Sequence, residues 1–134
     1  MRTLLDSSAL LAFYFGEPGA ERVREVLAED QGPVNISVLT AAEFWVRLRA
    51  VGAEDRFEQA WSQVREMVSD VFDVSLPVVL KAIDLRRAAT SRLPYIDALI
   101  AATAAHHDAV LIHCDSHFRS IPEALLRQEP LPLR

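Results

Sequence analysis

Three residue types are scarce in this chain of 134 residues, which has one cysteine, one lysine and four glycines. The single cysteine, Cys114, excludes a disulfide within the chain and a zinc site built from several cysteines, and it favours a reducing, cytoplasmic setting. The glycines do not form the pattern of a P-loop, so a phosphate site of that kind is excluded. Because Lys81 is the one lysine, the basic side chains are almost all arginine. Arginine suits bidentate phosphate contacts, although a genome-wide coding bias explains the same feature.

Long hydrophobic runs are also missing. No run reaches the roughly 18 apolar residues that a bilayer-spanning helix needs. Asp6 interrupts the apolar start of the chain, so we expect no signal peptide there. The length and the 51% share of hydrophobic residues suit one domain over residues 1–134. The formal net charge of −5 argues against binding nucleic acid by charge alone, because phosphate contacts need basic side chains.

Short apolar segments alternate with segments of helical periodicity along the whole chain. Strands are expected at 4–5, 34–37, 71–74 and 109–112, with a weaker edge strand at 130–133 and a turn at 30–33. Helices are expected at 7–15, 20–29, 40–50, 54–68, 77–92 and 95–106. Strands separated by helices favour an α/β fold with a parallel sheet and right-handed crossovers.

Four carboxylates stand where a strand is expected to give way to a helix or where a helix is expected to begin. They are Asp6, Glu43, Asp97 and Asp115. In a parallel sheet such positions meet at one rim, at the carboxyl ends of the strands, where ligands bind. Clustered carboxylates need a cation to stay ionised together, and oxygen-only clusters favour Mg²⁺ or Mn²⁺.

Each acid also has a purely structural interpretation. Asp6 and Asp115 are possible helix caps, as is Ser7 for the first helix, and Asp97 suits the first turn of a helix through the helix dipole. Glu43 matches the third position of a capping box that starts at Thr40. Asp6 and Asp97, however, sit among apolar neighbours, where an unpaired carboxylate is costly.

Residues near Asp6 and Asp115 also suggest two other kinds of site, a zinc site and a serine nucleophile. His113 and His117 flank Asp115 and together suggest a zinc site, but the expected change from strand to loop between them spoils the helical spacing. Ser7 and Ser8 beside Asp6 lack the elbow motif of a serine nucleophile, so a role in capping is favoured.

Several of these segments resemble PIN-domain proteins, in order and spacing along nearly the whole chain. The segments are LLDSSALLA (4–12), GEPGAERV (16–23), TAAEF (40–44), DALIAATA (97–104) and CDSHF (114–118). The size is similar to that of the VapC-type toxins of toxin–antitoxin pairs. The resemblance implies a Rossmann-like PIN domain with a central parallel sheet of four to five strands flanked by helices. It also implies an endoribonuclease that depends on Mg²⁺ or Mn²⁺ and is neutralised by a VapB-like antitoxin.

The resemblance maps the catalytic and metal-binding quartet onto Asp6, Glu43, Asp97 and Asp115. The chain departs from the family's usual pattern at two positions beside the last acid. His113 replaces the common Thr or Ser, and His117 stands where a further acid is frequent. Both departures bear on a second metal and on substrate contacts at that side of the site.

The chemistry expected of these residues is metal-assisted hydrolysis of a phosphodiester bond. Asp6, Asp97 and Asp115 are expected to hold the metal, while Glu43 completes the shell, contacts the metal through water or acts as a base. RNA as the substrate follows from the resemblance alone. Candidate phosphate contacts, which are also plain solvated residues, are Arg47, Arg49, Arg86, Arg87, Arg92 and Arg119. Two alternatives remain, a DNA or structure-specific nuclease and a catalytically silent binding module.

Aromatic side chains gather in three places, and a chain this short is not expected to bury them all. The residues are Phe13, Tyr14, Phe15, Phe44, Trp45, Phe57 and Trp61, with the aliphatic Leu48 on the same helix as Phe44 and Trp45. Part of this surface is therefore expected to form a homodimer contact and an apolar groove for an antitoxin segment.

Overall fold

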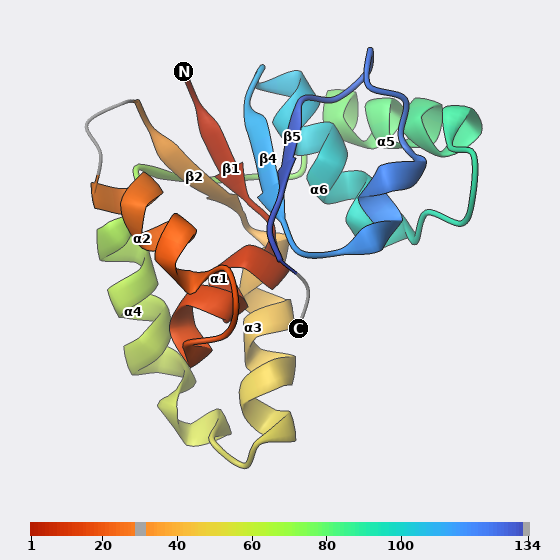
Figure 1. Cartoon of the computed structure of the whole chain (residues 1–134). Helices are drawn as coiled ribbons and strands as arrows, with labels where there is room; N and C mark the ends of the chain where they lie inside the picture. The colour runs from red at the N-terminus through yellow and green to blue at the C-terminus, as the bar shows by residue number, and fades with distance from the viewer. Residues whose placement is uncertain (29–31, 133–134) are drawn as a thin grey trace.

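Five short strands form one fully parallel sheet in the order β3-β2-β1-β4-β5 (Figure 1). The computed structural model describes residues 1–28 and 32–132. The strands are β1 (Thr3–Leu5), β2 (Val34–Ser37), β3 (Asp70–Phe72), β4 (Val110–His113) and β5 (Gln128–Pro130). The predicted α/β class and parallel sheet are confirmed. The predicted helix end at Glu29, the turn residues Asp30 and Gln31, and Leu133 of the predicted edge strand lie outside the described residues.

Helices cover the sheet on both faces because neighbouring strand residues point to opposite sides. Leu4 and Leu111 pack with α5 (Leu76–Ala88) and α6 (Tyr95–His106). Leu5 and Ile112 belong to a second cluster. This cluster includes residues of α1 (Ser7–Phe15), α2 (Ala20–Ala28), α3 (Leu39–Ala50) and α4 (Phe57–Met67). Two 3₁₀ turns, η1 (Glu54–Arg56) and η2 (Ser116–Ser120), complete the described elements.

Several predicted boundaries are wrong by a few residues. Strand β3 lies one to two residues earlier than predicted, β4 lies one residue later, and the edge strand β5 starts at Gln128 instead of residue 130. The segment predicted as one helix over 54–68 is the turn η1 followed by α4. Helix α5 ends at Ala88 instead of residue 92, because the chain is extended at Ala89 and the Thr90 N–H donates to Ser120 O at 2.9 Å.

The predicted capping box at Thr40 is wrong. Helix α3 begins at Leu39, and the Leu39 N–H donates to the Ser37 hydroxyl at 3.1 Å. Thr40 lies inside the helix and is fully buried, with its hydroxyl 3.0 Å from the Ser7 hydroxyl. The local sequence predicts that the Thr40 hydroxyl caps the helix, but this hydroxyl instead contacts the Ser7 hydroxyl, 33 residues away in the chain.

The aromatic side chains are buried further than expected. Phe44 and Leu48 are in the core, so they do not belong to the part of this surface that is expected to contact a partner. Tyr14 packs edge-on against Phe44 with ring centroids 4.9 Å apart, and Phe57 continues this row. Trp45, which lies on α3 with Phe44 and Leu48, is 37% exposed to solvent.

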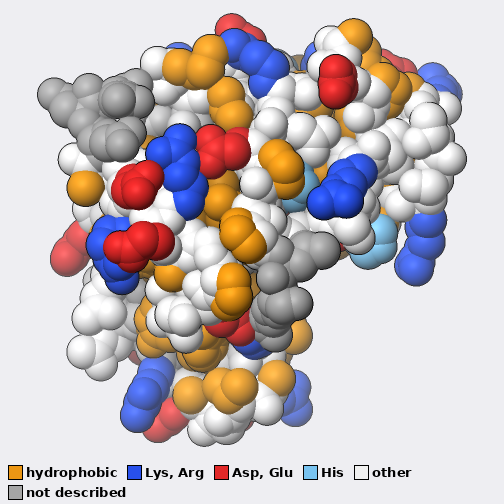
Figure 2. All heavy atoms as spheres, viewed as in Figure 1, with side chains coloured by type: hydrophobic (Ala, Val, Ile, Leu, Met, Phe, Trp, Pro, Cys, Tyr) orange, Lys and Arg blue, Asp and Glu red, His pale blue; other side chains and the backbone are white. Residues whose placement is uncertain are grey.

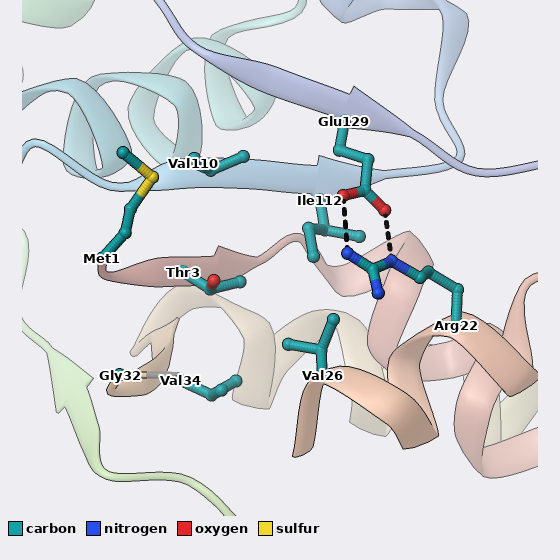
Figure 3. Close-up of a pocket in the computed structure, with 9 residues that line it drawn as sticks. All are labelled: Met1, Thr3, Arg22, Val26, Gly32, Val34, Val110, Ile112 and Glu129. Carbon is teal, nitrogen blue, oxygen red and sulfur yellow. Dashed lines mark hydrogen bonds and ion pairs between the residues drawn. The ribbon is translucent and has the colours of Figure 1, made fainter. Parts of the chain in front are cut away.

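A small cavity of about 180 Å³ lies between α2 and the first residues of the central strands (Figure 3). Across it, the Arg22 guanidinium donates two hydrogen bonds to the Glu129 carboxylate, at 2.8 and 3.1 Å. This pair ties α2 to the edge strand β5. Thr3, Val34 and Val110, the first residues of their strands, line this cavity, and the four predicted acids are not among its lining residues.

None of the helices in the described part of the chain combines the length and the apolar character that a bilayer crossing needs.

Candidate metal centre

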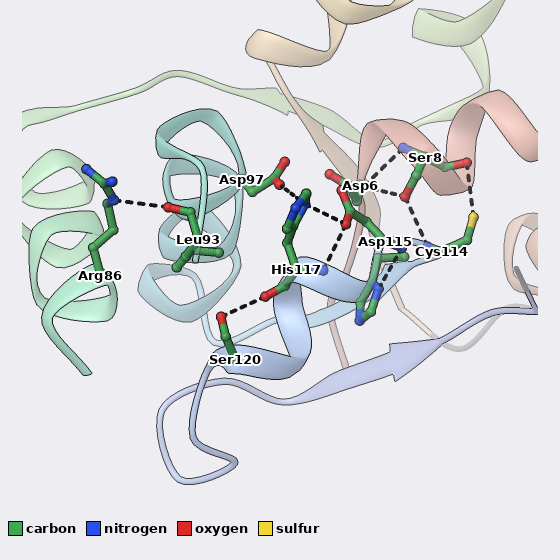
Figure 4. A network of polar contacts seen from close by, with 10 residues as sticks. Asp6, Ser8, Arg86, Leu93, Asp97, Cys114, Asp115, His117 and Ser120 are labelled. Atoms are coloured by element: carbon green, nitrogen blue, oxygen red, sulfur yellow. Dashed lines mark hydrogen bonds and ion pairs between the residues drawn. The ribbon is translucent and has the colours of Figure 1, made fainter. Parts of the chain in front are cut away.

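Asp6 directly follows β1 and is fixed by its neighbours on three sides. Its N–H donates to Ile112 O at 2.9 Å, which places it beside the end of β4. Its Oδ2 accepts from the Ser8 N–H at 3.0 Å and also from the Ser8 hydroxyl, so Asp6 is the N-cap of α1 (Figure 4). The Ser8 hydroxyl in turn accepts from the Cys114 N–H at 3.0 Å. Both side-chain bonds of Asp6 end on Oδ2, which leaves Oδ1 for a ligand.

Burial makes a charge on Asp6 unfavourable. The residue is only 3% exposed, and this burial raises the pKa of its carboxyl from 3.8 to about 7. The two hydrogen bonds from Ser8 act in the opposite direction, and the nearby charges of Glu43 and Asp97 raise the pKa further. A buried carboxylate that keeps its charge at neutral pH therefore needs a cation close by.

Asp97 shows the same behaviour. It lies in the first turn of α6, and burial together with the charge of Asp115 raises its pKa to about 6. Asp97, Asp115 and His117 each offer a ligand atom, and these atoms lie within 4.8 Å of one another. Figure 4 shows the His117 ring between the two carboxylates. These residues come from α6 and from the start of η2, so two distant segments build the group.

Glu43 approaches the cluster from α3. Its Oε1 accepts a hydrogen bond of 2.6 Å from the Ser7 hydroxyl, which is also in contact with Thr40. Its charge raises the pKa of both Asp6 and Asp97, so it faces the same space as they do. The structure thus brings all four predicted acids to the carboxyl end of the sheet. Asp115 also caps η2, since its Oδ1 accepts from the His117 N–H at 2.9 Å.

The basic group beside this cluster is the His117 ring, whose Nδ1 lies 3.1 Å from Asp97 Oδ2 and 2.9 Å from Asp115 Oδ1. Within residues 1–28 and 32–132, no lysine or arginine forms an ion pair with any of the four acids. The donor set is mostly carboxylate oxygen, with one imidazole at its edge. Such a set fits a divalent cation. The raised pKa values of Asp6 and Asp97 mean that their ionised forms are unfavourable without a cation.

Of the three residues of the disfavoured zinc site, His113, Asp115 and His117, the structure makes His113 unsuitable as a ligand. His113 is buried, and its pKa is lowered by that burial. Its Nδ1 accepts from the Asp115 N–H at 3.2 Å, so the neutral ring donates from Nε2 to Gln128 Oε1 at 2.8 Å. Both ring nitrogens are therefore occupied. His113 positions the backbone of Asp115 instead of holding a metal, while His117 does join the acids.

Sequence reasoning missed the supporting role of two serines. The sequence favours a capping role for Ser7 and Ser8, whereas in the structure the Ser7 hydroxyl donates to Glu43 and the Ser8 hydroxyl donates to Asp6. Their signal was their position directly after an acid at the end of a strand. Which acid each hydroxyl reaches depends on how α1 and α3 pack, and a single sequence does not show that.

The candidate phosphate-binding arginines differ in what they contact. Arg47 donates to Glu17 at 2.7 Å, and Arg86 donates to Leu93 O at 3.0 Å. Arg92 and Arg119 are exposed and form no ion pair within the part of the chain that the structure describes. On the face shown in Figure 2, basic side chains are scattered, and those over α2 stand beside acidic ones. Arg92 and Arg119 therefore remain the best candidates for phosphate contacts.

Comparisons with known proteins agree with this architecture. VapBC2 from Rickettsia felis, solved with a promoter DNA fragment, is similar with a TM-score of 0.78 and 18% identity, covering 98% of this chain and 100% of that one. VapBC-1 from nontypeable Haemophilus influenzae is similar with a TM-score of 0.74 and 19% identity, and the match covers 97% of this chain and 98% of that one. A toxin–antitoxin complex from Klebsiella pneumoniae is similar with a TM-score of 0.65 and 26% identity, and the match covers 90% of this chain and 92% of that one. A comparison with curated protein sequences finds no match.

The sequence also matches the PIN domain over residues 3–124, which confirms the resemblance seen in its motifs. That match includes all four acids of the cluster and every strand except β5. The chain belongs to the PIN domain family.

Proposed function

We propose that the protein is a metal-dependent endoribonuclease and the toxin of a VapBC-type toxin–antitoxin pair, built as one PIN domain over residues 1–134. Its proposed catalytic and metal-binding residues are Asp6, Glu43, Asp97 and Asp115. The observation that carries the proposal is the convergence of these acids without a lysine or arginine partner among the described residues, with the pKa of buried Asp6 raised to about 7. Membership of the PIN family and similarity to toxin–antitoxin complexes support it.

Mg²⁺ or Mn²⁺ is the proposed cofactor, because carboxylate oxygens suit both ions. When bound, such an ion lowers the pKa of a coordinated water and polarises the phosphate. Asp6 offers Oδ1 while Ser8 fixes its other oxygen, the charge of Asp97 acts on Asp6, and Asp97 and Asp115 each offer an oxygen within 4.8 Å of one another. Glu43, held by Ser7, is placed to orient a water or to accept its proton.

The decisive experiment compares RNA and DNA as substrates. We expect the purified protein to cleave single-stranded RNA with Mg²⁺ or Mn²⁺, to lose this activity in EDTA, and to leave DNA of the same sequence intact. Electrophoresis of labelled oligonucleotides measures all three results. Cleavage of DNA at the same rate would favour the structure-specific nuclease instead. Absence of cleavage of either substrate, with metal binding intact, would favour the silent binding module.

The proposed partners are a VapB-like antitoxin and a second copy of the chain. Trp45 and Val46 leave an apolar patch exposed on α3, with the Arg49 guanidinium 5.3 Å from the Trp45 ring centroid. Exposed tryptophans are frequent anchors of protein interfaces, and a basic antitoxin segment would complement the net charge of −5. A cytoplasmic location stays a prediction from the single cysteine.

Co-purification with the product of the adjacent gene tests this partnership. We expect the complex to form and to suppress RNA cleavage, and we expect Trp45→Ala to weaken it by about 2 kcal/mol or more. Leu125→Ala, at an exposed residue far along the chain, is the control. A protein that stays monomeric at high concentration, ignores the neighbouring gene product and still cleaves RNA would contradict the toxin assignment but leave the nuclease standing.

A further inference from the structure

We infer that His117 is a direct metal ligand through Nδ1 and that it shifts the preference of the site from Mg²⁺ towards Mn²⁺ and Co²⁺. The inference rests on the proposed metal-dependent function and adds a residue outside the predicted quartet. It concerns a position where a resemblance to the family leads one to expect an acid, so the chemistry of this chain differs there.

The position of Nδ1 is the first argument. It lies 3.1 Å from Asp97 Oδ2 and 2.9 Å from Asp115 Oδ1. Adjacent ligands of an octahedral ion, each about 2.1 Å from the metal, are about 3.0 Å apart. Nδ1 therefore already stands at the spacing of a third ligand beside the two carboxylate oxygens.

His117 Nδ1 also lacks a hydrogen bond to any of the described residues. The atom is almost inaccessible to solvent, yet neither carboxylate contact has the alignment of a hydrogen bond within the described residues. Buried ring nitrogens are ordinarily satisfied. An ion shared by the three residues would satisfy this nitrogen.

Two hydrogen bonds fix the backbone of the segment that carries the His117 ring. The His117 N–H donates to Asp115 Oδ1 at 2.9 Å, and His117 O accepts from the Ser120 hydroxyl at 2.7 Å. The turn η2 is thus held at both ends. A ligand mounted on such a turn needs little reorganisation when the ion binds.

The consequence is a change in metal preference. Mg²⁺ takes oxygen ligands and water, whereas imidazole suits the divalent transition metals. One nitrogen among carboxylates should therefore favour Mn²⁺ and Co²⁺ over Mg²⁺. The exposed fraction of the His117 side chain, 41%, leaves the opposite edge of the ring open to solvent and substrate.

Calorimetric titration with the metal chlorides alone tests the inference on the full chain. Wild type is expected to bind Mn²⁺ and Co²⁺ more tightly than Mg²⁺. His117→Ala should reduce affinity for Mn²⁺ and Co²⁺ by about tenfold or more, since even indirect supports of a metal site are worth that much. His117→Asp should bind Mg²⁺ and Mn²⁺ but lose the preference. His106→Ala, at an exposed histidine at the end of α6, is the matched control and should equal wild type.

The visible absorption of bound Co²⁺ provides a second measurement, because exchanging nitrogen for oxygen in the ligand set changes the spectrum. We expect His117→Asp to shift the spectrum and His106→Ala to leave it unchanged. Equal Mn²⁺ to Mg²⁺ affinity ratios in wild type, His117→Ala and His117→Asp would overturn the inference, and metal-dependent RNA cleavage by wild type would then show that the proposed function still holds. A wild-type protein that binds none of the three ions would overturn both.

Discussion

Replacing Asp97 or Asp6 by asparagine is expected to reduce RNA cleavage by at least about a hundredfold, the scale of losing one electrostatic contact to a transition state. Asparagine keeps the size of the side chain and one oxygen but removes the negative charge that the cation needs. Asp6 is buried and the Asp97 side chain is only 14% exposed, and neither acid pairs with a lysine or arginine among the described residues. Initial cleavage rates in Mg²⁺ and in Mn²⁺, at saturating RNA, measure the effect.

The control for this experiment is Asp84→Asn, which removes an exposed carboxylate paired with Arg87 on α5 and should leave the rate unchanged. Wild-type cleavage by Asp97→Asn would show that the metal-site assignment is wrong. Asp6 is also a helix cap, but asparagine caps a helix as well as aspartate does. A large loss of melting temperature in metal-free Asp6→Asn would therefore point to a purely structural role.

The second large effect is a loss of stability of the metal-free protein as the pH rises from about 4 to about 7. Folded Asp6 has a pKa of about 7, whereas the ordinary value is 3.8. Over that range the folded state keeps a proton that the unfolded state has released, so the free energy of unfolding falls with rising pH and levels off above about 7. The shift of Asp6 corresponds to about 4 kcal/mol at most. Asp97 acts in the same direction, in a window that ends near pH 6.

Urea denaturation in EDTA at pH 5 and pH 8 measures this effect. Asp6→Asn has no charge to bury, so it should be more stable than wild type at pH 8 and closer to it at pH 5. Adding Mg²⁺ or Mn²⁺ should stabilise wild type, with a larger effect at pH 8, because the ion binds the ionised folded state. If wild type and Asp6→Asn differ in unfolding free energy by the same amount at pH 5 and at pH 8, the role assigned to Asp6 is contradicted.

Local sequence patterns predict most of the secondary structure for a simple reason. The apolar pattern of a strand or helix depends on residues a few positions apart, and the run that ends at Asp6 therefore predicts β1. Predictions fail where a distant group intervenes. The sequence around Thr40 is that of a helix cap, but the Thr40 hydroxyl contacts the Ser7 hydroxyl instead. Helix α5 ends earlier than predicted because the Thr90 N–H donates a hydrogen bond to Ser120 O.

The sequence by itself determined the parallel α/β class, the family and the placing of Asp6 and Asp115 just beyond two strands, because these follow from local pattern and motif. Only the tertiary structure decided which acids share a space, since β1 and β4 become neighbours through hydrogen bonds across more than a hundred residues. It also decided that His113 is buried and bound on both nitrogens while His117 faces Asp97. Burial and proximity set the pKa of an acid, and both depend on residues that are far apart in the chain.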